Sequence, residues 1–459
     1  MLHIYDSLTQ KKQPLKPIDK NNIKMYVCGI TVYDFCHLGH ARMNVAFDVI
    51  SRYLRARGYH IKYVQNITDI DDKIIKRANE RGEPYFEFVE RFINAMHEDN
   101  KALGVLPPDE EPRATEFIPQ IIALIEILIE KGYAYVGTNG DIYYNVRHFK
   151  TYGELAHQNL DDLLSGARVD VSEAKHNPLD FVLWKLAKPN EPSWESPWGA
   201  GRPGWHIECS AMSTTCLGNH LDIHGGGLDL LFPHHQNEIA QSEAATGEKF
   251  VNLWLHNGFV NVDAEKMSKS LGNFTTIREA LKEYRPEVLR YFLLASHYRS
   301  PINYSSDNLA SATGALERLY TALRGLPIAT ELDPNHYEQR FYEKMDDDFN
   351  SPEALAVLFD LAREINRLKT PDTQQAAALA TLLKRLAGIL GLLQDNPEKF
   401  LQSSVDNTLD NLAIEKLIAE RSTAKANKDW GLADKIRKQL TDAGIILEDN
   451  AQGTTWRKR

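Results

Sequence analysis

Two histidines near the N-terminus have a spacing that suits phosphate binding. His37 and His40 stand three residues apart with Gly39 between them. Both imidazoles would lie on one face of a helix, and the glycine would let a ligand approach the backbone closely. Imidazole N–H groups at a helix N-terminus can donate hydrogen bonds to phosphate oxygens, aided by the helix dipole. The alternative is a pair of surface histidines without a ligand.

Two lysines much later in the chain have a similar capacity. The run KMSKS contains Lys266 and Lys269, and its other members are Met267, Ser268 and Ser270. Ammonium groups on such a loop could close over the β- and γ-phosphates of a nucleotide. A solvated surface loop would have a similar composition, so the run is informative mainly in combination with the histidine pair.

The residues around the histidine pair predict a strand, a tight turn and a helix. Residues 23–27 are mainly apolar and short enough for a buried parallel strand, and at Gly29 we expect the backbone to turn sharply. Apolar residues then recur at mostly helical spacing: Val45, Phe47, Val49, Ile50 and Leu54. Such a unit is where an open α/β sheet holds a nucleotide.

A glycine-rich run predicts the position of a ribose. Three consecutive glycines end at Gly227, after a short apolar strand, and Asp229 lies two residues further on. The glycines would let a base lie against the backbone, and the carboxylate can accept two hydroxyl hydrogen bonds. The alternative is a flexible turn. The run does not match GxGxxG, and the sequence contains no GxxxxGKS/T, so neither a dinucleotide fold nor a P-loop is indicated.

Four scattered residues could form a zinc site. His234 and Glu238 are four residues apart at the start of a predicted helix, so both could face one ion, although such pairs are usually surface or capping groups. We expect Cys28 and Cys209 to lie at strand ends in the two halves of one sheet. Two thiolates, one imidazole and one carboxylate make an acceptable zinc set. The alternative set of all four cysteines is not supported by their spacing.

Two further residues are candidates for contacts with a small substrate. Thr68 lies at the carboxyl end of a second predicted strand, where open α/β sheets place ligands. Its position favours the alternative, a cap for the next helix. Trp205 stands four residues before Cys209. It could form the wall of a small side-chain pocket, or it could belong to the core.

The composition predicts a soluble, cytoplasmic protein without membrane contact. Charged residues make up 25% of the chain, and the N-terminus lacks the pattern of a signal peptide. The most apolar long segment, residues 117–129, is too short to span a bilayer. The net charge of −10 argues against a nucleic-acid partner, but from Asp410 onward ten Lys and Arg face eight Asp and Glu, and residues 456–459 form a basic tip with an aromatic residue. RNA could therefore be held by local patches.

The combination of these runs resembles a known family. HLGH followed by KMSKS is similar to the two signature sequences of class I aminoacyl-tRNA synthetases, with Leu in place of the commoner Ile in the first. The residues around Cys28, the runs GWHIECSAM and GGGLDLLFPHHQNE, and KMSKSLGN together resemble the bacterial type of cysteinyl-tRNA synthetase. The similarity runs from about residue 23 to residue 304, with weaker agreement beyond.

The resemblance implies a reaction, its cofactors and its site residues. L-cysteine would be activated by ATP with Mg²⁺ and then transferred to the 3′-terminal ribose of tRNA-Cys by a monomeric enzyme. One Zn²⁺ per chain would bind the substrate thiol, held by Cys28, Cys209, His234 and Glu238. His37, His40, Lys266 and Lys269 would be catalytic, Gly39, Gly227, Asp229, Met267, Ser268 and Ser270 would bind ATP, and Gly29, Thr68 and Trp205 would bind cysteine.

Zinc would solve a selectivity problem. Cysteine and serine differ by one atom, and a pocket that recognises shape alone separates such pairs by only about 1 to 3 kcal/mol. Zinc prefers a thiolate to a hydroxyl and lowers the pKa of the thiol that it binds. Discrimination can then occur at binding, so no editing domain would be required.

We expect an α/β fold: a Rossmann-like parallel sheet split by an insertion, then a helical bundle and a small C-terminal α+β domain. The predicted boundaries are 1–100 and 205–262 for the two halves of the catalytic domain, 101–204 for the connective insertion, 263–308 for the KMSKS loop and stem-contact region, 309–400 for the bundle that binds the anticodon stem, and 401–459 for the linker and anticodon-binding domain.

Two other functions fit parts of the sequence. A cysteine-activating ligase with a non-RNA acceptor would share the catalytic half, but it should lack a domain such as residues 412–459. A zinc-stabilised protein that binds nucleotide or RNA without catalysis would have no need of a mobile lysine loop. Both alternatives are therefore weaker than the tRNA ligase.

Overall fold

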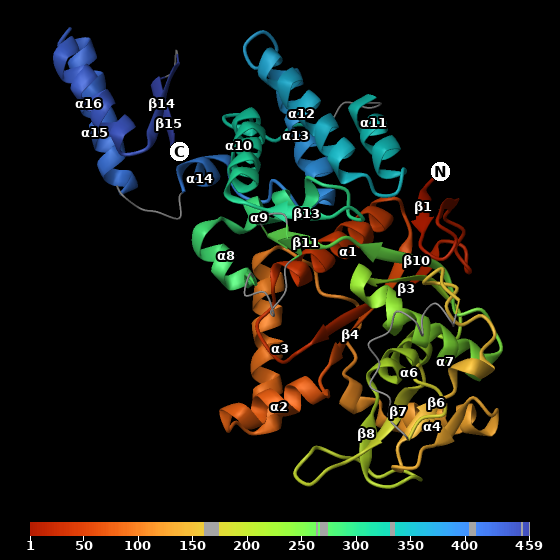
Figure 1. Cartoon of the computed structure of the whole chain (residues 1–459). Helices are drawn as coiled ribbons and strands as arrows, with labels where there is room; N and C mark the ends of the chain where they lie inside the picture. The colour runs from red at the N-terminus through yellow and green to blue at the C-terminus, as the bar shows by residue number, and fades with distance from the viewer. Residues whose placement is uncertain are drawn as a thin grey trace. The chain divides into compact units, whose positions relative to one another are not determined.

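The computed structural model describes residues 1–159, 174–262, 265–266, 274–330, 336–403, 410–450 and 453–458, and these form two compact units (Figure 1). The first unit consists of Met1–Arg278, Ser296–Tyr304 and Glu343–Ser351. The second consists of Glu279–Ala295, Ser305–Tyr342 and Pro352–Arg459. Among the described residues, no helix is both long and apolar enough to cross a bilayer.

A four-stranded parallel sheet forms the centre of the first unit. Its strands lie in the order β10-β9-β3-β4, and their bounds are β3 (Asn22–Thr31), β4 (His60–Thr68), β9 (Leu221–Gly227) and β10 (Val251–Asn257). The two central strands, β3 and β9, are adjacent although nearly 200 residues of sequence separate them, so the expected parallel α/β sheet with an insertion is confirmed.

Helices α1 (Leu38–Ala56), α6 (Trp205–Leu217) and α7 (Gln236–Thr246) accompany this sheet. Helix α1 contacts β4, β9 and β10, and α6 contacts β3 and β4. The approach of α1 to β9 is close, because a Cβ built on Gly225 would lie 2.2 Å from the Cζ atom of Phe47. The residues of the glycine run therefore lie inside β9, and not after it as predicted.

The chain leaves the parallel sheet after β4 and returns to it at β9. Between them lie helices α2 (Asp72–Arg81), α3 (Tyr85–Ala102) and α4 (Ile118–Glu130) and an antiparallel sheet of order β5-β6-β7-β8 (Figure 1). Its strands are β5 (Ala134–Val136), β6 (Ile142–Tyr144), β7 (Phe181–Leu186) and β8 (Gly201–Pro203). Alternating Tyr, Val and Ile around Asn139 and Gly140 predict a β-hairpin at residues 133–144, and the pairing of β5 with β6 confirms it.

Two smaller sheets complete the first unit. The N-terminal residues pair as an antiparallel hairpin of β1 (His3–Asp6) and β2 (Lys11–Pro14). A three-stranded sheet has the order β12-β11-β13, with β11 (Val260–Val262), β12 (Glu265–Lys266) and β13 (Ile302–Tyr304). Strand β12 contains the first lysine of KMSKS.

The second unit is mainly helical, as predicted. Its helices are α9 (Pro286–Leu294), α10 (Ser306–Leu323), α13 (Thr373–Ile389) and α14 (Pro397–Gln402), together with most of α8 (Ile277–Glu283), α11 (His336–Met345) and α12 (Ser351–Leu368), which cross the boundary in sequence. Leu316, Leu361 and Leu383 are fully buried, one each from α10, α12 and α13. Helix α14 crosses the predicted boundary between the bundle, which was expected to end at residue 400, and the linker.

The last part of the second unit has its own apolar core. Helices α15 (Asn411–Ala426) and α16 (Trp430–Asp442) precede an antiparallel pair, β14 (Ile445–Asn450) and β15 (Gly453–Lys458). The predicted small C-terminal α+β domain is therefore confirmed. Within the basic tip, Trp456 is buried in this core, and Arg457 pairs with Glu317 and Glu448.

Candidate active site and metal centre

The two histidines of HLGH form the N-terminal cap of α1. His37 is the N-cap residue, and its Nδ1 accepts hydrogen bonds from the backbone N–H groups of Gly39 at 3.0 Å and His40 at 3.3 Å. The Nδ1 of His40 accepts in turn from the backbone N–H of His37 at 3.3 Å. The two rings stack with centroids 3.6 Å apart.

This capping pattern determines which nitrogen carries the proton in each of the two neutral rings. A backbone N–H can only donate, so each Nδ1 must present a lone pair and each ring must carry its proton on Nε2. Two Nε2–H donors from adjacent rings therefore lie at the positive end of the α1 dipole. This arrangement suits an anion, and phosphate is the obvious class.

A pocket of about 300 Å³ contains these histidines. It brings together seven residues that the sequence predicted at the site: Gly29, His37, Gly39, His40, Trp205, Gly227 and Asp229. Thr68 does not line this pocket; its buried hydroxyl accepts a hydrogen bond from Asn66 Nδ2 at 3.2 Å. Thr68 is not the cap of the next helix either, because Asp71 caps α2.

The ribose candidate lies at the rim of the pocket. Asp229 is exposed in a single turn of 3₁₀-helix that follows β9. A Cβ built on Gly227 would lie 2.4 Å from Asp229 Oδ1, so a side chain here would displace this exposed carboxylate from its position beside the strand. The two preceding glycines pack against Phe47 and His235, so the glycine run serves packing as well as ligand access.

Gly29 is required by packing and not by a turn. Strand β3 continues through it to Thr31. A Cβ built on Gly29 would lie 1.5 Å from the backbone oxygen of Asn66 on β4, so no side chain fits. The pairing of β3 with β4 shifts between Val27 and Ile30, which is a β-bulge. The bulge contains Cys28 and directs this region of β3 toward the metal-binding candidates.

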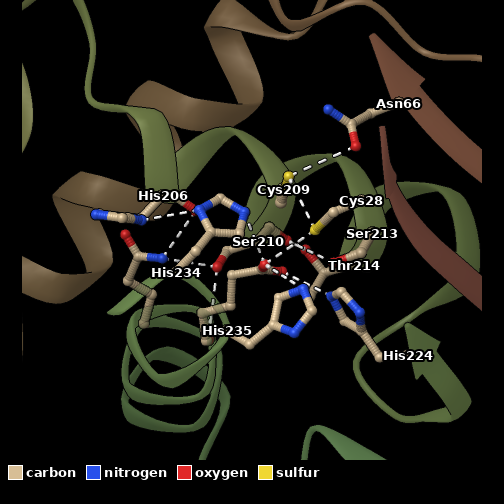
Figure 2. Close-up of polar contacts among 12 residues, drawn as sticks. Cys28, Asn66, His206, Cys209, Ser210, Ser213, Thr214, His224, His234 and His235 are labelled. Atoms are coloured by element: carbon tan, nitrogen blue, oxygen red, sulfur yellow. Dashed lines mark hydrogen bonds and ion pairs between the residues drawn. The ribbon is translucent and has the colours of Figure 1, made fainter. Parts of the chain in front are cut away.

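The four predicted zinc ligands converge. The donor atoms of Cys28, Cys209, His234 and Glu238 all lie within 4.8 Å of one another, and all four residues are buried. Cys28 Sγ lies 3.7 Å from Cys209 Sγ and 3.3 Å from Glu238 Oε1. Figure 2 shows the two sulfur atoms side by side. The predicted strand end at Cys209 is wrong, because this residue lies in α6.

The charges of this cluster are two buried anions beside one histidine whose pKa is raised to about 10. Burial opposes ionisation of Glu238, but His224 and His234 outweigh it and lower its pKa to about 2. Burial likewise opposes ionisation of Cys209, but hydrogen bonds from Cys28 and His234 lower the pKa of this thiol to about 6. Glu238 is therefore anionic at neutral pH and Cys209 largely so. Buried anions are costly unless they are paired or bind a metal.

The orientation of His234 also suits a metal. Its Nε2 lies 3.0 Å from Glu238 Oε1 without the alignment of a hydrogen bond, as expected of two donors directed at one ion. Its Nδ1 lies 2.9 Å from Nδ1 of His206, whose pKa is far below its usual value because burial disfavours the charged ring. Burial opposes charging of His234, but Glu238 and Cys209 raise its pKa to about 10, so a metal would have to displace the Nε2 proton. Neutral His206 can accept the remaining Nδ1 proton, which would leave the Nε2 lone pair for the ion. The donor set fits zinc.

Models of known families match most of the chain. The model of "tRNA synthetases class I (C) catalytic domain" matches residues 14–314, a "DALR domain" matches 340–394, and a "Cysteinyl-tRNA ligase anticodon binding domain" matches 411–457. The cysteine–tRNA ligase of Alkalilimnicola ehrlichii is 61% identical to this protein, and the match covers 100% of both chains. The cysteine–tRNA ligase of Ectopseudomonas mendocina is also 61% identical, and the match covers 99% of both chains. The chain belongs to the cysteinyl-tRNA synthetase family.

Solved structures of other class I synthetases share the fold of this family member. Mycobacterium tuberculosis methionyl-tRNA synthetase in complex with methionyl-adenylate matches with a TM-score of 0.57 and 15% identity, covering 80% of this chain and 89% of the other. A putative arginyl-tRNA synthetase from Campylobacter jejuni matches with a TM-score of 0.54 and 13% identity, covering 83% and 95%. At these identities the likeness concerns the fold alone.

The KMSKS signature of the family lies largely outside the described residues. Lys266 pairs through its backbone with Asn261, but its side chain and residues 267–273, with the predicted Met267, Ser268, Lys269 and Ser270, are not described. The described flank lies beside the histidines: Leu38 N donates to Thr275 O at 3.2 Å, and Ile277 N donates to Cys36 O at 2.9 Å. The ring of Phe274 meets that of His37 edge-on at 5.2 Å.

Sequence reasoning missed a buried group of histidines behind the four donors. His224 Nε2 lies 2.8 Å from Glu238 Oε2, and His235 Nδ1 lies 2.8 Å from His256 Nε2. His224 and His235 form a second donor group with Cys28 and Glu238. A signal was present, because His224 directly precedes the glycine run and His235 directly follows His234, but the periodicity of a sequence does not distinguish a buried histidine from a surface one.

Proposed function

We propose that this protein activates L-cysteine with ATP and transfers it to the 3′-terminal ribose of tRNA-Cys, with zinc selecting the substrate thiol. The observation that carries the zinc part is the convergence of Cys28, Cys209, His234 and Glu238 next to the histidine pocket. The cluster and the pocket adjoin, because Gly29 follows Cys28 and lines the pocket, and Trp205 lines it while stacking on His234.

The first step is formation of the adenylate. A carboxylate oxygen of cysteine attacks the α-phosphorus of ATP, the bond to the bridging oxygen breaks, and pyrophosphate leaves with its Mg²⁺. The protein contributes mainly position and charge, because phosphoryl and nucleotidyl transfer need no covalent catalyst. The Nε2–H groups of His37 and His40 would donate to phosphate oxygens, and Gly39 leaves room for them.

The remaining ATP contacts follow from the signature residues. The carboxylate of Asp229 would accept hydrogen bonds from the ribose hydroxyls, with the base against Gly227. Lys266 and Lys269 would neutralise the β- and γ-phosphates as charge develops. Met267, Ser268 and Ser270 are proposed as further ATP contacts. For these residues the proposal rests on the family signature.

The amino acid would lie between the pocket and the four donors. When bound there, Zn²⁺ would accept the cysteine thiol as a thiolate, which a serine hydroxyl matches poorly. Trp205, whose ring centroid lies 4.3 Å from that of His234, would wall the side-chain pocket. Gly29, which lines the pocket, would contact the amine or carboxylate, whereas for buried Thr68 this role rests on the family resemblance alone. Shape alone would give only about 1 to 3 kcal/mol of discrimination, so the metal supplies the rest.

The second step, transfer of the activated cysteine to the 3′-terminal ribose, requires an RNA acceptor. The family model for residues 411–457 is an anticodon-binding domain, and full-length relatives are cysteine–tRNA ligases, so a non-RNA acceptor is not favoured. We propose that the protein acts as a monomer in the cytoplasm. A tRNA that binds the catalytic domain with its 3′ end and the C-terminal domain with its anticodon would explain why the chain combines these two domains.

The test is charging of tRNA-Cys with radiolabelled cysteine, followed by acid precipitation. We expect label on tRNA-Cys only when ATP is present, and none on tRNA-Ser. Adenylate formation without label on tRNA would contradict the RNA acceptor. A shortened chain that ends at residue 403 should form the adenylate but charge tRNA-Cys poorly, because it lacks the anticodon-binding domain.

A further inference from the structure

The side chain of Asn66 connects three parts of the candidate site, and no site residue named so far performs this task. Asn66 is 1% exposed at the end of β4. Its Oδ1 accepts the backbone N–H of Gly29 at 2.8 Å, and its Nδ2 donates to Thr68 Oγ1 at 3.2 Å. Figure 2 shows the same Oδ1 facing Cys209, with 3.6 Å between Oδ1 and Sγ.

The orientation of this amide is determined by the backbone. The N–H of Gly29 can only donate, so the oxygen of the Asn66 side chain, and not its nitrogen, must face β3. The nitrogen then lies on the side of Thr68, whose hydroxyl can accept. Both hydrogen bonds are satisfied by one orientation, so the side chain has a single well-defined position.

The hydrogen bond to Gly29 closes the bulge that contains the first thiol. Val27 pairs with Gln65 and Ile30 with Ile67, so Cys28 and Gly29 together oppose Asn66 alone. A bulge of this kind leaves one residue of the longer strand without its ladder partner. The Asn66 side chain provides the missing acceptor, which avoids the cost of an unpaired N–H next to the core.

We propose that Asn66 is a positioning residue for the metal centre. By holding the bulge that contains Cys28, it keeps this thiol at the distance from Cys209 that a shared ion requires. Its second hydrogen bond fixes Thr68 relative to the same two residues. This inference rests on the proposed zinc function, but it concerns the affinity of the protein for zinc before any substrate binds.

The experiment compares Asn66→Leu with a matched control, Gln65→Leu. Gln65 precedes Asn66 on β4 and is also buried, but its amide bonds Tyr63 and Asn44, away from the cluster. The dissociation constant for zinc is measured on the full chain by competition with a chromogenic chelator. We expect Asn66→Leu to weaken zinc binding by about 10- to 100-fold and Gln65→Leu to leave it within about threefold of wild type, although both lower the unfolding temperature.

Zinc affinity separates the possible outcomes. Zinc affinity of Asn66→Leu within threefold of wild type would overturn the proposal, as would an equal loss in Gln65→Leu. If Asn66→Leu does not fold, as judged by circular dichroism, Asn66→Ala replaces it with the same expectation. A wild-type chain that binds zinc but does not activate cysteine would contradict the proposed function and leave the Asn66 comparison valid, whereas a wild-type chain that binds no zinc would overturn both.

Discussion

His37 has two separable tasks in this structure, and substitution by asparagine should separate them. Its Nδ1 caps α1 by accepting from Gly39 and His40, and its Nε2 carries the proton proposed to meet a phosphate oxygen. Asparagine is among the best N-cap residues, so His37→Asn keeps an acceptor for the helix but has no group in place of Nε2. Alanine removes both.

The expected magnitudes differ for the two tasks. Loss of an N-cap costs about 1 kcal/mol, with a range of about 0.5 to 2. His37→Ala should therefore be less stable than His37→Asn by roughly this amount, because both lose the stacking on His40 and Phe274 equally. Loss of one positioned donor to developing charge costs about 10²- to 10³-fold in rate. Both variants should show this loss.

The assays are urea unfolding, followed by tryptophan fluorescence, and cysteine-dependent exchange of pyrophosphate into ATP. Zinc content serves as a control, because neither variant touches the four donors. If His37→Asn kept more than about a tenth of the wild-type exchange rate, Nε2 would not be the catalytic group. If the asparagine and alanine variants unfolded at the same urea concentration, the capping role would be wrong.

Two further predictions concern packing and pH. Gly29→Ala should bind less than one equivalent of zinc in a metal assay, because its Cβ would lie 1.5 Å from the backbone oxygen of Asn66. Gly314→Ala should bind zinc normally, because a Cβ built there has no neighbouring residue within 4 Å. Normal zinc content in Gly29→Ala would show that the bulge can move. Burial and then His224 lower the pKa of His256 to about 3, below its unfolded value, so the folded state binds fewer protons and loses stability as the pH falls below about 6.5. At pH 5 this group should cost about 2 kcal/mol relative to pH 7, and His256→Gln should flatten the dependence in urea titrations; an equally steep dependence in that variant would exclude His256 as its source.

Local patterns in the sequence were sufficient for much of the fold. The apolar run before HLGH and the helical spacing after it predicted β3 and α1, because a buried parallel strand and an amphipathic helix have different periods. Asn139 and Gly140 between alternating residues predicted the hairpin of β5 and β6. The four donors were predicted through family resemblance, since no spacing rule connects residues so far apart.

The errors have two physical causes: burial of polar groups, and close contact between distant parts of the chain. Helix α6 was not predicted around Cys209 because Glu208, Ser210 and Ser213 are buried, so the helix has no polar face to give a 3.6-residue period. Gly29 was assigned to a turn because a sequence cannot show which backbone approaches it. Asn66 was passed over for the same reason, since its partners on β3 and α6 come from distant parts of the chain.

The central claim is that a metal ion held by Cys28, Cys209, His234 and Glu238 distinguishes a thiol from a hydroxyl. The most direct measurement is pyrophosphate exchange with cysteine and with serine, each before and after zinc is removed by a chelator. We expect strong exchange with cysteine and almost none with serine in the zinc-loaded protein, and loss of most cysteine exchange on chelation, restored by added zinc. Exchange with serine at a similar rate, or a preference for cysteine that survives complete removal of the metal, would contradict the account.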